Sequence, residues 1–431
     1  MFLLVLLTAT MLIRPGEVFP DLEGLPFYLW IIATAILFNF ERILKQLQTR
    51  SIRSRPMLAS MLGILFAGFM SHLLSLRTID AREYIDLFIR IVVFYLLLTG
   101  VVTTKYRLIT MLKCVAFFSI IEVGMAVTDY LGYYDFPAIK SVSETYTDPV
   151  THIPHEFMRM CGTGLFADPN DLCMLISVGA TLCFYFMTRS FLGIFWAVPL
   201  GFLIYAITLT HSRGGLLSLV AAGITIFIAK FGWRKMTPLI VMAVPFIFLL
   251  GGRQTAITTG EGTGQSRVQL WSAGFTAIVT ERSPCFGIGV NRYAEVAGQV
   301  AHNSFVQAYV ETGFVGGTCF FALFYYGIVN LYRVKRYGTE FIDPELIQIQ
   351  PYLLGMLVGV SVSMMSLTRN LTVPVYLFSG LVECYLLIIS AQIPFLIPPL
   401  DRVQFKRIIR ASLIFLLTLY FYTKASVRFG P

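Results

Sequence analysis

Long apolar stretches follow one another along almost the whole chain, separated by short polar segments. Each stretch is roughly 15–24 residues long, which is the length that an α-helix needs to cross the hydrocarbon layer of a membrane. The apolar residues are continuous and do not alternate with polar ones, so the pattern favours helices. It predicts an all-α, polytopic membrane protein with about 12 or 13 transmembrane helices, folded as a single integral membrane domain over residues 1–431.

Composition agrees with this prediction. Of the 431 residues, 56% are hydrophobic and only 13% are charged, and the mean hydropathy is +0.74. Residues 1–13 are apolar without a basic start or a small-residue cleavage site, so we expect a first span, or a truncated one, and no cleaved signal peptide. The lipid bilayer is therefore the expected surrounding of the chain.

The formal net charge of +9 does not indicate a nucleic-acid partner, because the Lys and Arg residues lie in short loops between spans. Basic clusters fall on alternate loops, at residues 42–55, 105–107, 230–235, 333–336 and 402–410. The positive-inside rule then places these loops and the amino terminus in the cytoplasm. Two long loops, 132–169 and 251–313, face outward, and loops of this length in a helix bundle are usually functional.

Neither a metal nor a disulfide has strong support. His152, His155 and Glu156 form an H-x-x-H-E pattern, but a third well-spaced ligand is missing, so we expect no metal or other cofactor. Only Cys161 and Cys285 of the seven cysteines lie in loops, and their spacing leaves a disulfide between them open.

His302 begins HNSFVQAYVETG, a short segment at the end of the second long loop. If a helix runs from here to a cap at Gly313, then Asn303, Gln307 and Glu311 recur every four residues on one stripe. His302 would project from the membrane edge, where an imidazole can take a proton from a substrate. The alternative is an interfacial histidine with a structural role.

Two arginines are candidates for binding a phosphate. Arg213 lies in TLTHSRGGLLSLV, residues 208–220, where two spans meet, and a planar guanidinium suits a pair of phosphate oxygens. Arg267 lies in GEGTGQSRVQLWSAGFTAIV, residues 260–279, which we predict to be an amphipathic helix on the outer leaflet. No Walker lysine follows these glycines, so a nucleotide site is not expected. Snorkelling or a helix-end salt bridge is the structural alternative for Arg213.

Charged residues inside the spans are compatible with transport across the membrane. Arg90 and Glu122 fall at comparable predicted depths and could pair, and Glu383 has no obvious partner. A polytopic transporter or lipid-linked glycan flippase would use such groups. However, the sequence shows no inverted repeat of the kind that marks many transporters. A non-catalytic scaffold of an export complex is a third alternative.

Taken together, several motifs resemble the O-antigen ligase and polymerase superfamily. They are HSRGG at 211–215, the loop arginine Arg267, FGIGVNRY at 286–293 and AHNSFVQAYVETGFVGG at 301–317. RMCGTGLFADPNDL at 159–172 is similar to the R-x-x-G…N segment of that family. The motifs cover roughly residues 159–320, with the ligase and polymerase region at 208–320.

The resemblance implies a membrane glycosyltransferase of the GT-C type in the cytoplasmic (inner) membrane. Such an enzyme takes a glycan from an undecaprenyl diphosphate carrier at the periplasmic face, without metal or nucleotide sugar, and inverts the anomeric carbon. Arg213 and Arg267 would hold the diphosphate, and His302 would activate the acceptor hydroxyl. The remaining candidates for binding the diphosphate or the glycan are Arg159, Asn303, Glu311 and His211. The acceptor stays open between lipid A core, a glycan chain and a protein.

Overall fold

The computed structural model describes residues 1–22, 24–147, 154–238, 263–280, 283–337 and 342–427. These residues contain eleven helices that are long and apolar enough to cross a membrane, together with a shorter apolar helix, Phe2–Leu12. The chain is therefore a multi-pass helical membrane protein, as the sequence predicts. Within the described residues the only sheet is one two-stranded hairpin in the predicted outer loop 132–169.

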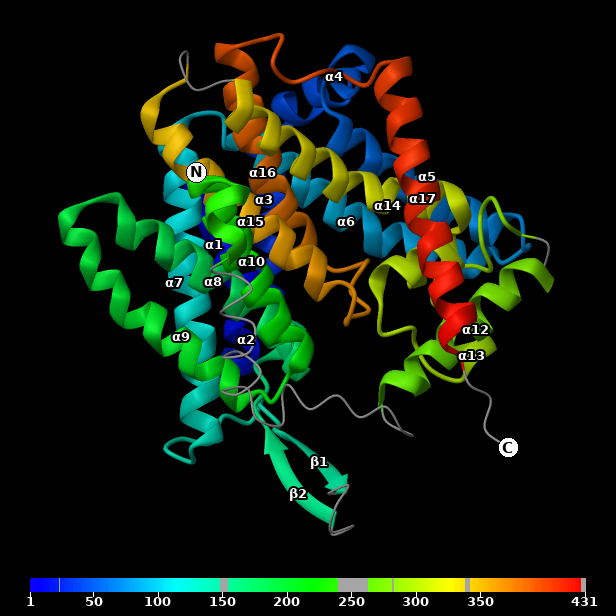
Figure 1. Cartoon of the computed structure of the whole chain (residues 1–431), viewed down its shortest axis with the longest axis horizontal. Helices are drawn as coiled ribbons and strands as arrows, with labels where there is room; N and C mark the ends of the chain where they lie inside the picture. The colour runs from blue at the N-terminus through cyan, green and yellow to red at the C-terminus, as the bar shows by residue number, and fades with distance from the viewer. Residues whose placement is uncertain (23, 148–153, 239–262, 281–282, 338–341, 428–431) are drawn as a thin grey trace. The chain divides into compact units, whose positions relative to one another are not determined.

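The described residues form two compact units, and α3 (Phe27–Gln46) passes from the first to the second at a non-helical residue, Asn39. Unit 1 is built from Met1–Phe38, Thr104–Ala256 and Pro344–Ser363, and unit 2 from Asn39–Thr103, Ile257–Asp343 and Met364–Pro431. Figure 1 shows their elements. Besides the start of α3, unit 1 contains α1 (Phe2–Leu12), α2 (Pro15–Val18), η1 (Pro20–Leu22), α7 (Lys105–Tyr130), β1 (Val142–Thr147), β2 (Pro154–Arg159), η2 (Gly164–Phe166), α8 (Pro169–Arg189), η3 (Phe191–Trp196), α9 (Ala197–Leu209), α10 (Arg213–Phe231) and α15 (Pro344–Ser363). Unit 2 contains α4 (Thr49–Ser54), α5 (Pro56–Leu73), α6 (Thr78–Val101), α12 (Thr263–Thr280), α13 (Tyr293–Ala297), α14 (Ser304–Tyr337), α16 (Val373–Gln392) and α17 (Arg402–Ser426).

In unit 1, α8 is the central helix and packs against α7, α9, α10 and α15. Of the apolar stretch of α8, 83% is buried, whereas only 22% of the apolar stretch of α10 is buried. Small residues let α8, α10 and α15 approach closely: Ser218 donates to the Gly359 carbonyl over 2.9 Å and lies 3.2 Å from the Ser177 hydroxyl. This packing fixes the axis of α10, whose first residue is Arg213.

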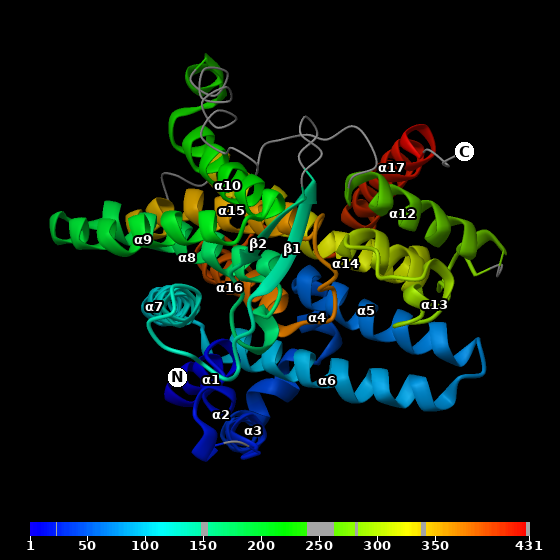
Figure 2. The same cartoon turned by 90° about the horizontal axis from the view of Figure 1, so that it is seen from below.

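In unit 2, α5 packs between α6 and α14, and α16 packs against α6 and α14 (Figure 2). Tyr84 on α6 donates to the Ile64 carbonyl on α5 over 2.8 Å. Tyr309 on α14 contacts the Ser412 hydroxyl on α17 at 2.8 Å. These contacts between apolar helices hold α14, which begins two residues after His302.

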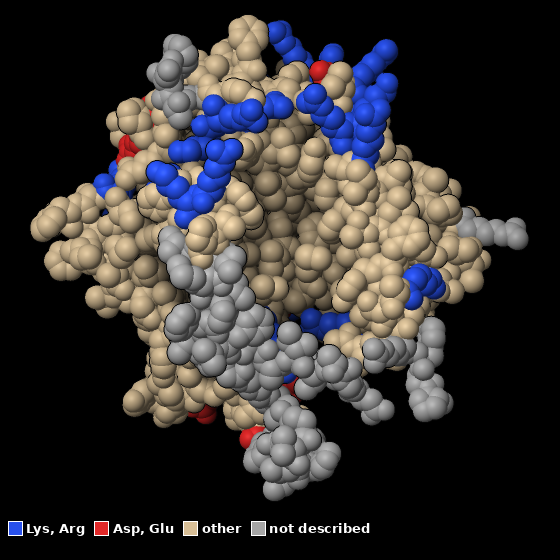
Figure 3. Space-filling model, in the orientation of Figure 1, with Lys and Arg blue, Asp and Glu red and all other residues tan. Residues whose placement is uncertain are grey.

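Basic residues of α4 and of the first turns of α17 meet at one end of unit 2. The Leu400 N–H donates to the Arg53 carbonyl over 2.8 Å, which places the start of α17 beside α4. Figure 3 shows Lys and Arg side chains gathered at the upper right of the view, where Figure 1 places these elements. Two of the basic clusters that the sequence assigns to one side of the membrane, 42–55 and 402–410, therefore do share an end of this unit.

Candidate active site

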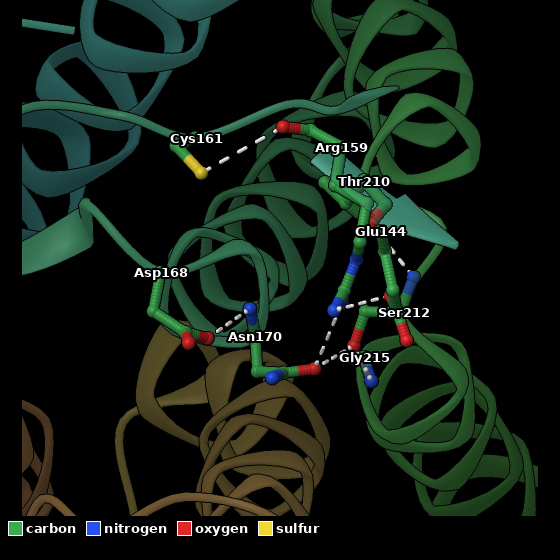
Figure 4. Close-up of polar contacts among 8 residues, drawn as sticks. All are labelled: Glu144, Arg159, Cys161, Asp168, Asn170, Thr210, Ser212 and Gly215. Carbon is green, nitrogen blue, oxygen red and sulfur yellow. Dashed lines mark hydrogen bonds and ion pairs between the residues drawn. The ribbon is translucent and has the colours of Figure 1, made fainter. Parts of the chain in front are cut away.

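Arg159, the last residue of β2, ties the hairpin of unit 1 to the start of α10 (Figure 4). Its Nε donates to the Thr210 carbonyl over 3.1 Å, its Nη1 lies 3.2 Å from a Glu144 carboxylate oxygen, and its Nη2 lies 3.5 Å from Asn170 Oδ1. The register of the two strands explains the contact between Arg159 and Glu144. Arg159 pairs with Val142, and Glu144, two residues further along β1, is its diagonal neighbour on the same face. With its side chain only 15% exposed, Arg159 directs its donors into the protein.

Ser212 joins two segments that the sequence singled out. Its Oγ caps α10 by accepting the Gly215 N–H at 3.0 Å, and it donates to Asn170 Oδ1 at 2.5 Å. Asn170 lies in the first turn of α8, where Asp168 accepts its backbone N–H at 2.7 Å. The HSRGG motif and the R-x-x-G…N segment thus share one hydrogen-bonded cluster, which fixes the first turn of α10.

Arg213 is the first residue of α10 and projects from this fixed turn. Its side chain is exposed, and within the described ranges it has neither an acidic nor a hydrogen-bonding partner. The guanidinium therefore stands beside the amide groups of a helix start, an arrangement that suits an anionic ligand. His211 lies two residues earlier with φ +51°, and its ring packs edge-on against Phe157 at 5.3 Å.

Also in unit 1, the buried Glu122 on α7 holds the loop that follows β2. One carboxylate oxygen accepts the Thr163 N–H at 2.6 Å and the Thr163 hydroxyl at 2.9 Å. Glu122 is thus used for the loop within unit 1, and Arg90 is exposed on α6 of unit 2, so the pairing of these two residues stays a prediction. Glu383 also has a partner, since the Tyr95 hydroxyl donates to it.

All seven cysteines are free thiols, so the disulfide that the sequence left open is not formed. Cys161 is buried in the loop after β2, whereas Cys285 is exposed. Burial raises the pKa of the Cys161 thiol to about 11. Within the described ranges no group of three His, Cys, Asp or Glu side chains is placed to hold a metal ion. His152 lies outside those ranges.

In unit 2, His302 occupies a tight turn immediately before α14. Its φ of +48° lies in the left-handed region, which is uncommon for a residue with a side chain. The preceding residue is held on both sides: the Ala301 N–H donates to Gln307 Oε1 at 3.0 Å, and the Ala301 carbonyl accepts from Trp271 Nε1 at 2.7 Å. His302 itself is half-buried. The surrounding contacts therefore fix its backbone.

The predicted polar stripe of α14 exists, but it faces the protein interior. Asn303, Gln307 and Glu311 are 0%, 4% and 1% exposed. Asn303 Oδ1 caps the helix by accepting the backbone N–H groups of the next turn, and the Gln307 amide donates to Glu311. Glu311 also accepts the Tyr293 N–H at 3.4 Å. These side chains are used within unit 2, although Asn303 Nδ2 is buried without a hydrogen-bond partner among the described residues.

Arg267 lies near the start of α12, half-buried and one helical turn before Trp271. Residues four apart on a helix share a face, so Arg267 lies on the side of α12 whose Trp271 binds the turn before His302. The Tyr293 hydroxyl donates to the Leu270 carbonyl over 2.9 Å and braces the same helix. Burial raises the pKa of Tyr293, so its hydroxyl remains a donor.

Gly313 ends the first helical stretch of α14, as the sequence predicts, with a non-helical backbone and φ +64°. A second helical stretch follows at once and continues to Tyr337. The FGIGVNRY turn fills the break: the Ile288 and Gly289 N–H groups donate to the carbonyls of residues 310 and 311 at 3.0 Å. A Cβ on Gly313 would lie 2.3 Å from the Cys285 carbonyl carbon, so only glycine fits here.

Sequence reasoning missed three contributors to these contacts. Trp271 reads as one more apolar residue of an amphipathic segment, and Glu144 as one of several carboxylates in a loop. The third is Ser304, whose hydroxyl donates to the Leu367 carbonyl at 2.7 Å and accepts the Arg369 N–H at 2.9 Å. This contact brings a further arginine backbone to the start of α14. No spacing rule connects residues 304 and 369.

Residues 198–321 match the family model described as O-antigen ligase. The match confirms the resemblance to the O-antigen ligase and polymerase superfamily. At family level, the match supports a membrane enzyme of the O-antigen ligase type. The matched segment includes Arg213, Arg267 and His302. No curated protein matches the chain.

Proposed function

We propose that this protein transfers a glycan from an undecaprenyl diphosphate carrier onto an acceptor hydroxyl at the periplasmic side of the cytoplasmic membrane. The single observation that carries the proposal is the family match over residues 198–321, which contains Arg213, Arg267 and His302. The structure adds support in unit 2, where the Trp271 contact ties the helix of Arg267 to the turn of His302.

The two arginines serve the leaving group. When the bond between the anomeric carbon and the carrier phosphate breaks, its electron pair and negative charge pass to the diphosphate. Fixed guanidinium groups stabilise that charge and can bind phosphate oxygens in pairs, so the reaction needs no divalent metal. The exposed side chain of Arg213, on a capped helix start in unit 1, suits this task, and the family resemblance gives the same task to Arg267 on α12 of unit 2.

His302 serves the acceptor. An alcohol attacks the anomeric carbon more readily as it loses its proton, and a neutral imidazole can accept that proton. The acceptor oxygen forms the new bond from the face opposite the diphosphate, so the configuration inverts. The His302 imidazolium then returns the proton to solvent or to the released diphosphate.

The other predicted site residues fit supporting roles better than substrate contact. Arg159 is occupied by Thr210, Glu144 and Asn170, and His211 packs against Phe157. We therefore assign both to holding the HSRGG segment and Arg213 in place. Asn303 and Glu311 are buried and bond within unit 2, so we assign both to holding the start of α14 beside His302.

The transport alternative gains no support from the charged residues on which it rests. One oxygen of Glu122 is bound by Thr163, and Glu383 is bound by the Tyr95 hydroxyl. One oxygen of each carboxylate thus has a structural partner within its unit, while Glu122 Oε2 and Glu383 Oε1 are buried without a hydrogen-bond partner among the described residues.

The test is complementation of a host that lacks this gene, with surface glycan and carrier-linked glycan measured by gel. His302→Ala and Arg213→Ala, expressed at wild-type levels, should each lower transfer by about 10²–10³-fold while carrier-linked glycan accumulates. Arg90→Ala is the matched control, because this arginine is equally exposed but lies on α6, outside the matched segment. Normal glycan with both site variants would refute the proposal, and a loss confined to Arg90→Ala would favour transport.

A further inference from the structure

A continuous chain of hydrogen bonds leads from the kink of α14 to the turn of His302. The Tyr293 N–H and the Gln307 amide nitrogen both donate to Glu311. The Gln307 amide oxygen accepts the Ala301 N–H at 3.0 Å. The amide of Gln307 is therefore oriented at both ends, since its nitrogen is directed to a carboxylate and its oxygen to the backbone beside His302.

This chain is placed where a substrate does not reach. Gln307 is 4% exposed and Glu311 is 1% exposed. A buried carboxylate is costly unless donors surround it, and here the Tyr293 N–H and the Gln307 amide supply donors to Glu311. The turn that this chain supports has an unusual backbone conformation: His302 has φ +48°, which the neighbouring contacts must maintain.

We infer that Gln307 and Glu311 are positioning residues, which set the backbone of the His302 turn and thereby aim the imidazole at the acceptor hydroxyl. The inference rests on the proposed role of His302. Glu311 fixes which way the Gln307 amide points, and Gln307 fixes Ala301. Trp271 holds the same residue from the other side, so the turn keeps one conformation while the helix of Arg267 stays in register with it.

The consequence is a specific pattern among variants. Gln307→Leu removes the acceptor of the Ala301 N–H, and we expect kcat to fall about 10–100-fold, the cost of a small misplacement of a reacting group. The KM for the carrier-linked donor should stay within about twofold, because no donor contact is lost. Glu311→Gln keeps an oxygen acceptor and should retain activity within about threefold of wild type.

A polarity swap provides the sharper test. Gln307→Glu alone places two carboxyl groups against each other and should lower kcat. Combined with Glu311→Gln, the new carboxyl at 307 can accept both the Ala301 N–H and the amide donated from 311, so most of the lost kcat should return. Recovery in the double variant measures coupling between the two positions, which independent structural damage does not produce.

A second cycle separates positioning from general stability. In purified protein reconstituted with carrier-linked glycan extracted from the host, Gln307→Leu is compared in the wild-type and His302→Ala backgrounds at equal folded protein. If Gln307 acts through His302, the substitution has no further effect once the imidazole is gone. An equal fold-loss in both backgrounds, or no recovery in the polarity swap, overturns the inference.

The same measurements distinguish failure of the proposed function from failure of the positioning role. Normal transfer by His302→Ala refutes the proposed function itself. Loss of transfer in His302→Ala, together with unchanged kcat in Gln307→Leu, refutes only the positioning role. Trp233→Phe, an exposed tryptophan outside this chain of contacts, is the matched control for Trp271→Phe, which should behave like Gln307→Leu.

Discussion

Replacing Ser212 with alanine should destabilise unit 1 and weaken transfer together. Ser212 is 1% exposed, and its hydroxyl caps α10 through the Gly215 N–H at 3.0 Å while donating to Asn170 at 2.5 Å. Loss of a serine cap costs about 0.5–2 kcal/mol. Loss of the buried donor for Asn170 costs about 1 kcal/mol more. The sum of roughly 1.5–3 kcal/mol corresponds to a fall in Tm of about 3–12 °C for a unit of this size.

The assay is thermal unfolding of the purified protein in one detergent, with transfer measured on the same preparations. Thr104→Ala is the matched control, because Thr104 caps α7 through the Arg107 N–H at 3.4 Å on the exposed surface and should cost no more than about 0.5 kcal/mol. Ser212→Ala should also lower transfer, because the first turn of α10 carries Arg213. An unchanged Tm in Ser212→Ala, or a fall equal to that of Thr104→Ala, would refute the reasoning that this cluster holds the start of α10.

Four further outcomes follow from the contacts. Glu122→Gln keeps an oxygen acceptor for the loop after β2 and should unfold near the wild-type temperature, whereas Glu122→Leu should lose about 1–3 kcal/mol in the same thermal assay. Maleimide at pH 8, with labelling measured by mass spectrometry, should modify the exposed Cys285 and leave Cys161 unmodified. With a pKa of about 11, only about 0.1% of the Cys161 thiol is ionised at this pH, and its labelling should rise as the pH increases. Gly313→Ala should destabilise the protein by several kcal/mol, because its Cβ would collide with the backbone, while Gly223→Ala, with open space around it in α10, should be neutral or slightly stabilising. Transfer in the reconstituted assay should persist in excess EDTA, and its loss with recovery on adding Mg²⁺ would contradict the role given to the arginines.

Several features of the fold could be read from the sequence because they depend on local patterns. Apolar length predicts the spans, since any helix that crosses the hydrocarbon layer must bury its backbone polar groups within itself. The start of α14 was also predictable, because Asn303 is a capping residue before an apolar run. Ser212 begins α10 for the same reason.

Longer-range contacts decided what local patterns could not. The sequence predicts that a helix ends at Gly313, and the backbone there is non-helical with positive φ. The sequence does not show that a second helical stretch follows at once, because the backbone of residues 284–289 bonds the groups freed at this break. The sequence likewise does not show that the loop after β2 supplies donors to Glu122 through Thr163, because the two are 41 residues apart.

The sequence alone determined that this protein is a multi-pass helical membrane protein, and its motifs indicated Arg213, Arg267 and His302 as the residues to examine. Side-chain type and spacing are sufficient for the spans and for the motifs. Insertion of a span into lipid depends on a run of neighbouring apolar residues, and a short motif likewise consists of residues close together in the chain. Only the tertiary structure decided how these residues are supported. The Ser212–Asn170 bond, the Trp271–Ala301 bond and the chain from Glu311 to Ala301 each join groups whose meeting depends on helix packing, and packing is a property of the whole fold.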